Sequence, residues 1–155
     1  MIKNYKRILV PLDNSKYSER ALVEAIPIAK KFDSKLYLLS AIDASPIEPS
    51  SISLLAIKAG RTSKTTQQMA SSAYETAHFI LERKSYECKK AGVNVEYKVV
   101  TGHAPESILE FAAKNDIDLI VMGSQGLGGI KKIKVLGSVS RKVSENAQCP
   151  VMLVH

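Results

Sequence analysis

Short apolar runs alternate with amphipathic segments along the whole chain, and this alternation limits the fold more than any other feature. The runs are rich in Ile, Leu and Val; they are Lys6–Asp13, Lys35–Ile42, Val93–Thr101, Asp118–Met122 and Pro150–Val154. Between them, apolar residues recur at three- and four-residue steps, at Ser15–Phe32, at Gln68–Ala91, after Pro105 and at Gly137–Ala147. Apolar strands separated by helices predict a parallel sheet covered on both faces. We therefore expect one domain, 1–155, folded as a doubly wound five-stranded α/β sandwich.

Local signals refine two of the predicted helices. Asn14 or Ser15 is the expected N-cap of the first helix, and Pro27 is expected to kink or split that helix near Val23. The helix at Gln68–Ala91 is expected to turn one apolar side inward, made of Met69, Ala73, Ala77, Ile80, Leu81 and Cys88.

The stretch Asp43–Gln67 differs in composition from the rest of the chain. It contains two prolines and many Ser and Thr residues, and Ser51–Ala59 could form a short helix closed by Gly60. A connection of this length is typical of functional or mobile loops. We therefore interpret it as a mobile surface insertion.

The net charge of +7, from 22 Lys and Arg against 15 Asp and Glu, is concentrated in one stretch. Gly123–Lys142 holds five of the cations and no acid. This locality favours a compact anionic ligand over nucleic acid, although a solvated lysine-rich loop is an alternative. The sequence shows no apolar run of membrane-spanning length, no signal peptide and, in its two cysteines, no disulfide framework. We expect a cytoplasmic protein without membrane contact.

A glycine-rich loop follows the fourth strand, where a doubly wound sheet binds its ligands. It reads Gly123-Ser124-Gln125-Gly126-Leu127-Gly128-Gly129, and Gly137-Ser138 opens the last helix. Glycines let backbone N–H groups converge on an anion, and a helix N-terminus adds further donors. Ser138 is expected to cap that helix and to donate its hydroxyl to a phosphate. The pattern suits a nucleotide, or a merely flexible turn, but it is neither the P-loop nor the dinucleotide fingerprint.

At this point the sequence resembles the universal stress protein family over essentially its whole length. The resemblance rests on Pro11-Leu12-Asp13 with Ser15, on Val121–Ser124, on Gly137-Ser138-Val139-Ser140 and on the ending Cys149–Val154. The nucleotide-binding branch of that family has a Gly-x2-Gly-x9-Gly-Ser/Thr pattern. Here ten residues, not nine, separate Gly126 from Gly137.

The resemblance implies an adenine nucleotide alpha-hydrolase-like fold with strand order 3-2-1-4-5, and it implies ATP as the ligand. It places Pro11 and Asp13 near the ribose or adenine, the Ala41 backbone at the adenine edge, and Met122 beside the nucleoside. It places at the phosphates Gly123, Gly126, Gly137, Ser138 and the backbone of Val139. A magnesium ion held by the phosphates is compatible with this arrangement.

Other readings of the same residues point elsewhere. Asp13 could instead cap the first helix. Ser124, His103 and Asp13 lie on different elements without a nucleophile elbow, so we assign no catalytic triad and no catalytic residue. The three histidines lack metal-ligand spacing, and we assign no metal ligand.

The last strand, Pro150–Val154, carries no charge and is expected at the sheet edge, where it is poorly protected against pairing. We expect it to pair across a two-fold axis in a homodimer. The favoured function is an ATP-binding regulatory or signalling homodimer with at most slow hydrolysis. The alternatives are an interaction module that binds no nucleotide because of the longer loop, and an ATP-dependent enzyme with 43–67 as its lid.

Overall fold

The five predicted strands form a single parallel sheet. The structure is a computed structural model that describes residues 4–43, 62–127 and 136–155. The strands are β1 (Arg7–Pro11), β2 (Lys35–Ile42), β3 (Asn94–Thr101), β4 (Leu119–Gly123) and β5 (Val151–Val154). They pair in the order β3-β2-β1-β4-β5, which confirms the predicted order 3-2-1-4-5.

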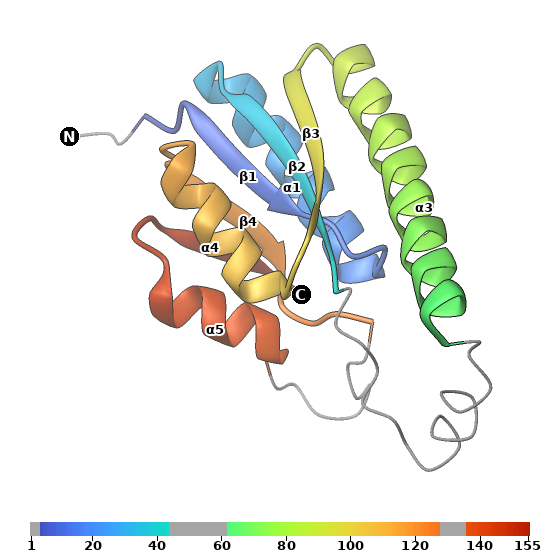
Figure 1. Cartoon of the computed structure of the whole chain (residues 1–155). Helices are drawn as coiled ribbons and strands as arrows, with labels where there is room; N and C mark the ends of the chain where they lie inside the picture. The colour runs from blue at the N-terminus through green and yellow to red at the C-terminus, as the bar shows by residue number, and fades with distance from the viewer. Residues whose placement is uncertain (1–3, 44–61, 128–135) are drawn as a thin grey trace.

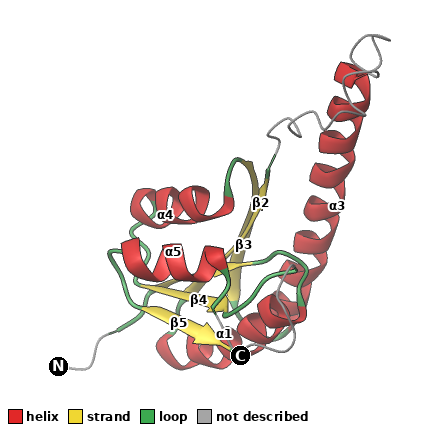
Figure 2. Cartoon of the chain, turned by 90° about the horizontal axis from the view of Figure 1, so that it is seen from below, coloured by secondary structure: helices red, strands yellow, loops and turns green. Residues whose placement is uncertain are grey.

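Helices cover both faces of this sheet, as Figures 1 and 2 show. They are α1 (Lys16–Phe32), α3 (Thr62–Lys90), α4 (Ala104–Lys114) and α5 (Ser138–Asn146). Helices α1 and α3 lie on one face and α4 and α5 on the other, because the side chains of each pair belong to a different buried cluster. The doubly wound architecture is therefore confirmed. Within the described parts of the chain, no helix is both long and apolar enough to cross a membrane.

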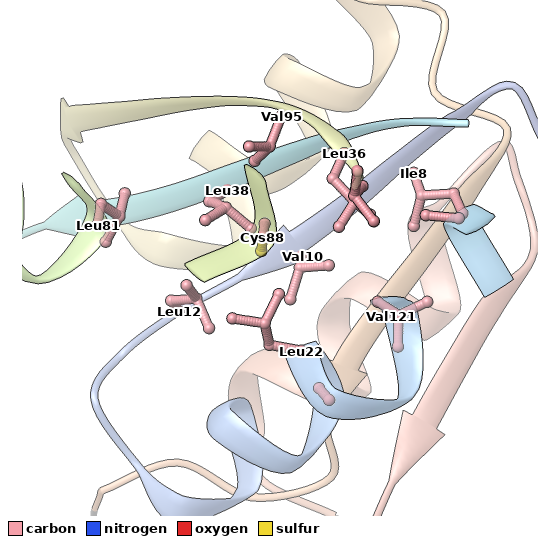
Figure 3. Close-up of a cluster of buried hydrophobic side chains, with 14 of the residues drawn as sticks. Ile8, Val10, Leu12, Leu22, Leu36, Leu38, Leu81, Cys88, Val95 and Val121 are labelled. Atoms are coloured by element: carbon pink, nitrogen blue, oxygen red, sulfur yellow. The ribbon is translucent and has the colours of Figure 1, made fainter. Parts of the chain in front are cut away.

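The two clusters follow from the alternation of side chains along each strand. In β1, Ile8 and Val10 point toward α1 and α3, whereas Leu9 points toward α4 and α5. Figure 3 shows the first cluster, where Val10 lies among Leu38, Leu22 and Val121. The β1 and β2 residues labelled there, Ile8, Val10, Leu36 and Leu38, are fully buried. Burial of such side chains on both faces is the main source of the fold's stability.

Helix α1 begins as predicted and then departs from the prediction. Ser15 is its N-cap, and the Ser15 hydroxyl accepts a hydrogen bond from the Ser18 N–H at 3.1 Å. The helix runs unbroken through Pro27, so the predicted split near Val23 is wrong. Proline removes one helical donor, but Pro27 and Val23 are both exposed, so the unpaired carbonyl lies on the solvent side.

Helix α3 begins earlier than predicted, and the boundary placed at Gln67 is wrong. Residues 62–67, which were assigned to the insertion, are helical. No apolar residue occurs between Thr62 and Gln68, so no periodicity marks this start. Met69 and Ala73 are exposed, contrary to the predicted inward side. The expected short helix at Ser51–Ala59 lies outside the described residues.

The central strand β1 joins the two halves of the sheet. It pairs with β2 on one side and with β4 on the other. At its start, the backbone N–H groups of Lys6 and Arg7 both donate to Asp118 Oδ2 at 2.9 Å, across 112 and 111 residues of sequence. The carboxyl ends of β1, β2 and β4 are thereby held side by side at one edge of the sheet.

Candidate functional site

A pocket of about 350 Å³ opens at the carboxyl ends of β1, β2 and β4. The first residues of α4 and α5 close it on the side of the second buried cluster. Its size falls in the ordinary range for small-molecule sites. The structure brings together in this one pocket all nine residues singled out from the sequence: Pro11, Asp13, Ala41, Met122, Gly123, Gly126, Gly137, Ser138 and Val139.

Asp13 lies on the turn between β1 and α1. Its Oδ1 accepts a hydrogen bond from the Ser15 N–H at 3.0 Å, and Asn14 between them has a φ of 63°. This is the local bond that an aspartate makes two residues ahead in a turn. Because Ser15 caps α1, the alternative in which Asp13 is the cap is wrong. Asp13 Oδ2 instead faces the glycine-rich loop, since a Cβ on Gly126 would lie 2.8 Å from it.

The three glycines of the predicted motif face different neighbours. A Cβ on Gly123 would lie 2.7 Å from the Tyr17 carbonyl carbon and 2.9 Å from the Ser18 nitrogen, so Gly123 lets α1 approach the end of β4. A Cβ on Gly126 would crowd Asp13, inside the pocket. A Cβ on Gly137 would lie 3.3 Å from Gln125 Cα. Gly123 is therefore needed for packing, and Gly126 for access to the pocket.

The two ends of the glycine-rich loop meet. The Gly137 N–H donates to the Ser124 carbonyl at 2.8 Å. Residues 128–135, within the stretch that is one residue longer than the family pattern, lie outside the described residues. Gly137 and Gly126 nevertheless lie next to each other in space. A Cβ on Gly137 would lie 3.5 Å from the Gly126 nitrogen.

The N-terminus of α5 points its unpaired donors at the pocket. Gly137 is the N-cap and supplies no side-chain bond, so the prediction that Ser138 caps this helix is wrong. Ser138, Val139 and Ser140 are the first three helical residues, whose N–H groups have no partner within a helix, and all three line the pocket. Together with the helix dipole they form a site suited to an anion.

Helix α4 adds a second uncapped N-terminus to the same pocket. Its N-cap, His103, makes no side-chain cap bond, and the next residue, Ala104, lines the pocket. His103 Nδ1 lies 2.9 Å from Asp43 Oδ2, at the ends of β3 and β2. An ion pair between Lys142 and Glu106 joins α5 to the first turn of α4, and this hydrogen bond lowers the pKa of the Glu106 carboxyl.

Ser140 also lines the pocket, and the sequence did not single it out as a site residue. It is 2% exposed, and its hydroxyl lies 3.1 Å from the Gly123 carbonyl and 2.9 Å from the Ser124 carbonyl. This contact fixes the first turn of α5 against the end of β4. The only signal in the sequence was the second serine of Gly137-Ser138-Val139-Ser140, one turn into the helix.

Part of the pocket lining is apolar. Leu39, Ala41, Ile108 and Met122 contribute its walls. Asp13 is the one charged residue among the described lining residues, and its Oδ2 faces Gly126. No cluster of three or more His, Cys, Asp or Glu side chains suited to a metal ion occurs in residues 4–43, 62–127 and 136–155. The pocket thus combines apolar walls, a carboxylate and a helix N-terminus suited to an anion.

The fold and this pocket define a doubly wound α/β protein with a pocket at the switch point of its sheet, where folds of this kind bind ligands. The chain belongs to the universal stress protein family, whose sequence model matches residues 4–155. A universal stress protein of Methanocaldococcus jannaschii is 34% identical over 151 residues, which cover 97% of this chain and 82% of that protein.

Solved structures of the same family share the fold. A universal stress protein of Lactobacillus plantarum superposes with a TM-score of 0.84 at 22% identity, covering 99% of this chain and 100% of that one. A universal stress protein solved in complex with cAMP gives a TM-score of 0.70 at 25% identity, covering 99% and 98%.

Proposed function

We propose that this chain binds an adenine nucleotide, ATP, in the 350 Å³ pocket and acts as a regulatory or signalling homodimer with little intrinsic hydrolysis. The observation that carries the proposal is the juxtaposition in one pocket of apolar walls and the uncapped α5 N-terminus. The first suits a purine base, and the second suits phosphates.

The pocket suggests a direction for the nucleotide. The base would lie on Met122 and the backbone of Ala41, the ribose beside Asp13, and the phosphates at Gly126 and the first turn of α5. The family relative solved with cAMP supports an adenine nucleotide as the ligand class. A magnesium ion, if bound, would be held mainly by phosphate oxygens and water.

We propose little hydrolysis because the pocket offers no well-placed general base among its described lining residues. The one candidate is Asp13. It is the one carboxylate among the described lining residues, and its Oδ1 already accepts the Ser15 N–H. A general base must reach the proton that it removes. Asp13 is better placed to accept hydrogen bonds from ribose hydroxyls than to activate a water at the phosphates.

Isothermal titration with ATP, ADP and AMP in the presence of magnesium tests the binding. We expect saturable binding, and we expect Gly126→Val to abolish it, because its side chain would fill the space beside Asp13. Ala113→Val, at an exposed position of α4 away from this pocket, is the matched control and should bind as the wild type does. No binding at millimolar nucleotide would refute the proposal, and prompt turnover by the protein alone would favour the enzyme alternative.

The two edges of the sheet support the homodimer. The edge strand β3 carries Glu96 and Lys98, whereas β5 is apolar along its length. The Pro150 and Val154 carbonyls bond to β4, so the alternating backbone groups of Val151 and Leu153 point to the free edge. An uncharged edge of this kind is open to pairing with a second copy. Light scattering that finds a monomer at micromolar concentration would refute this part of the proposal.

A further inference from the structure

A second, larger pocket of about 690 Å³ opens beside the first. Four residues line both pockets, at the ends of β1 and β2 and in the loop after β4; they are Leu12, Asp13, Ala41 and Leu127. The two pockets therefore adjoin at these four residues.

The walls of this second pocket come from α3 and from the end of β2. Figure 1 shows the N-terminal end of α3 extending past the carboxyl ends of β2 and β3. Its Met69, Ala73 and Ile80 face the pocket, and Ile42 of β2 lies opposite. Small side chains, such as Ala73 and Ser72, leave the space open.

The charge of the described lining residues disfavours a phosphate in the second pocket. Its described lining residues include no Lys or Arg, and their one charged side chain is Asp13, at the junction with the first pocket. Among these residues an anion would meet a carboxylate and mostly apolar walls without a compensating cation, which is unfavourable. The pocket instead suits an uncharged apolar group.

Two large apolar side chains at this pocket are strongly exposed. Met69 is 65% exposed on α3, and Leu127 is 74% exposed at the junction of the two pockets. Apolar side chains gathered at a hollow, rather than scattered singly, mark ligand-binding surfaces. An apolar group seated between them would remove both from water.

We propose that the ligand is an adenine nucleotide that carries an apolar aromatic or acyl group on its base–ribose side, and that this group occupies the second pocket. The inference rests on the proposed function. With the phosphates at the α5 N-terminus, Asp13 stands beside the ribose and at the opening into the second pocket. A substituent on the ribose hydroxyls would therefore pass Asp13 and reach Ile42, Met69 and Ala73.

The probe for this test is ATP with an N-methylanthraniloyl group on its 2′ or 3′ oxygen, an aromatic group whose fluorescence rises in apolar surroundings. We expect it to bind about tenfold more tightly than ATP, a gain of about 1.4 kcal/mol. We expect its emission to be enhanced and shifted to shorter wavelength. The chain contains no tryptophan, so the protein's own emission interferes little.

Two variants of α3 locate the group. Ala73→Phe fills the second pocket and should remove the tenfold gain while leaving the affinity for ATP unchanged. Ser71→Phe, an equal change at an exposed position of α3 outside the pocket, should keep the gain.

Each result separates the two proposals. If neither ATP nor the labelled nucleotide binds, the proposed function fails and this inference fails with it. If ATP binds and the labelled nucleotide binds no more tightly, the nucleotide site stands and the extension is refuted. A gain that survives in Ala73→Phe would also refute it, because the aromatic group would then lie elsewhere.

Discussion

Gly123→Ala tests whether the first glycine of the loop serves packing rather than ligand binding. The new Cβ would lie 2.7 Å from both the carbonyl carbon and the Cβ of Tyr17, and 2.9 Å from the Ser18 nitrogen. Favourable carbon–carbon contacts are about 3.5–4.0 Å long, so the overlap is on the order of 1 Å. Most of the atoms that it meets are backbone atoms of the first turn of α1, which cannot turn aside as a side-chain tip can.

Two opposing terms set the size of the effect. Overpacking of this kind costs about 1–3 kcal/mol. The loss of a glycine reduces the entropy of the unfolded chain and returns about 0.4–1 kcal/mol. We expect a net destabilisation of about 1–2 kcal/mol. For a chain of this length each kcal/mol lowers the melting temperature by about 2–4 °C.

Urea unfolding followed by circular dichroism measures this change. Gly126→Ala is the matched control in the same loop, because its Cβ would meet only Asp13 Oδ2, the end of a side chain that can rotate. Its free energy of unfolding should stay within about 0.5 kcal/mol of the wild type. Equal stability of Gly123→Ala and wild type, or equal losses in both variants, would refute the distinction between the two glycines.

Three further predictions concern the described residues outside the pocket. Ser15→Ala removes the bond to the Ser18 N–H and should cost about 1 kcal/mol in urea unfolding, whereas Ser144→Ala, whose hydroxyl only bonds back to a helix carbonyl, should cost less. Burial raises the pKa of the Cys88 thiol to about 11 from 9.0, so unfolding exposes a more acidic thiol. Stability should therefore fall as pH rises from about 9 to 11, and Cys88→Ala should flatten that part of the profile. The hydrogen bond from Lys142 lowers the pKa of Glu106, so its small contribution to stability is present at neutral pH and lost as pH falls through the lowered pKa. An NMR titration should show that pKa rising in Lys142→Ala.

The fold could be predicted because apolar residues recur along the chain with the periods of strands and helices. The alternation of Ile8, Leu9 and Val10 between the two buried clusters is a direct result of strand geometry. The start of α3 could not be predicted, because the helix begins at Thr62 and its first two turns carry no apolar residue. The apolar periodicity on which the prediction relied is therefore absent there.

The glycine-rich loop shows a different limit. The sequence shows that three positions of the loop, Gly123, Gly126 and Gly137, carry no side chain. It does not show which atoms approach the backbone at each position. That depends on residues more than 100 positions away, Tyr17 for Gly123 and Asp13 for Gly126. Strand order brings the nine candidate residues together in one pocket. Which neighbour each glycine faces can be seen only in the folded structure. Their role in binding stays a prediction.

The position of β1 between β2 and β4 has a consequence for how the protein is made. Its first partner, β2, leaves the ribosome soon after it, while β4 and the carboxylate of Asp118 that ties down its start come more than 100 residues later. Chains fold from the N-terminus during synthesis at about 5–20 residues per second. The part of the pocket formed by β1 and β2 is therefore made several seconds before α5, and the pocket is complete only once α5 has been made.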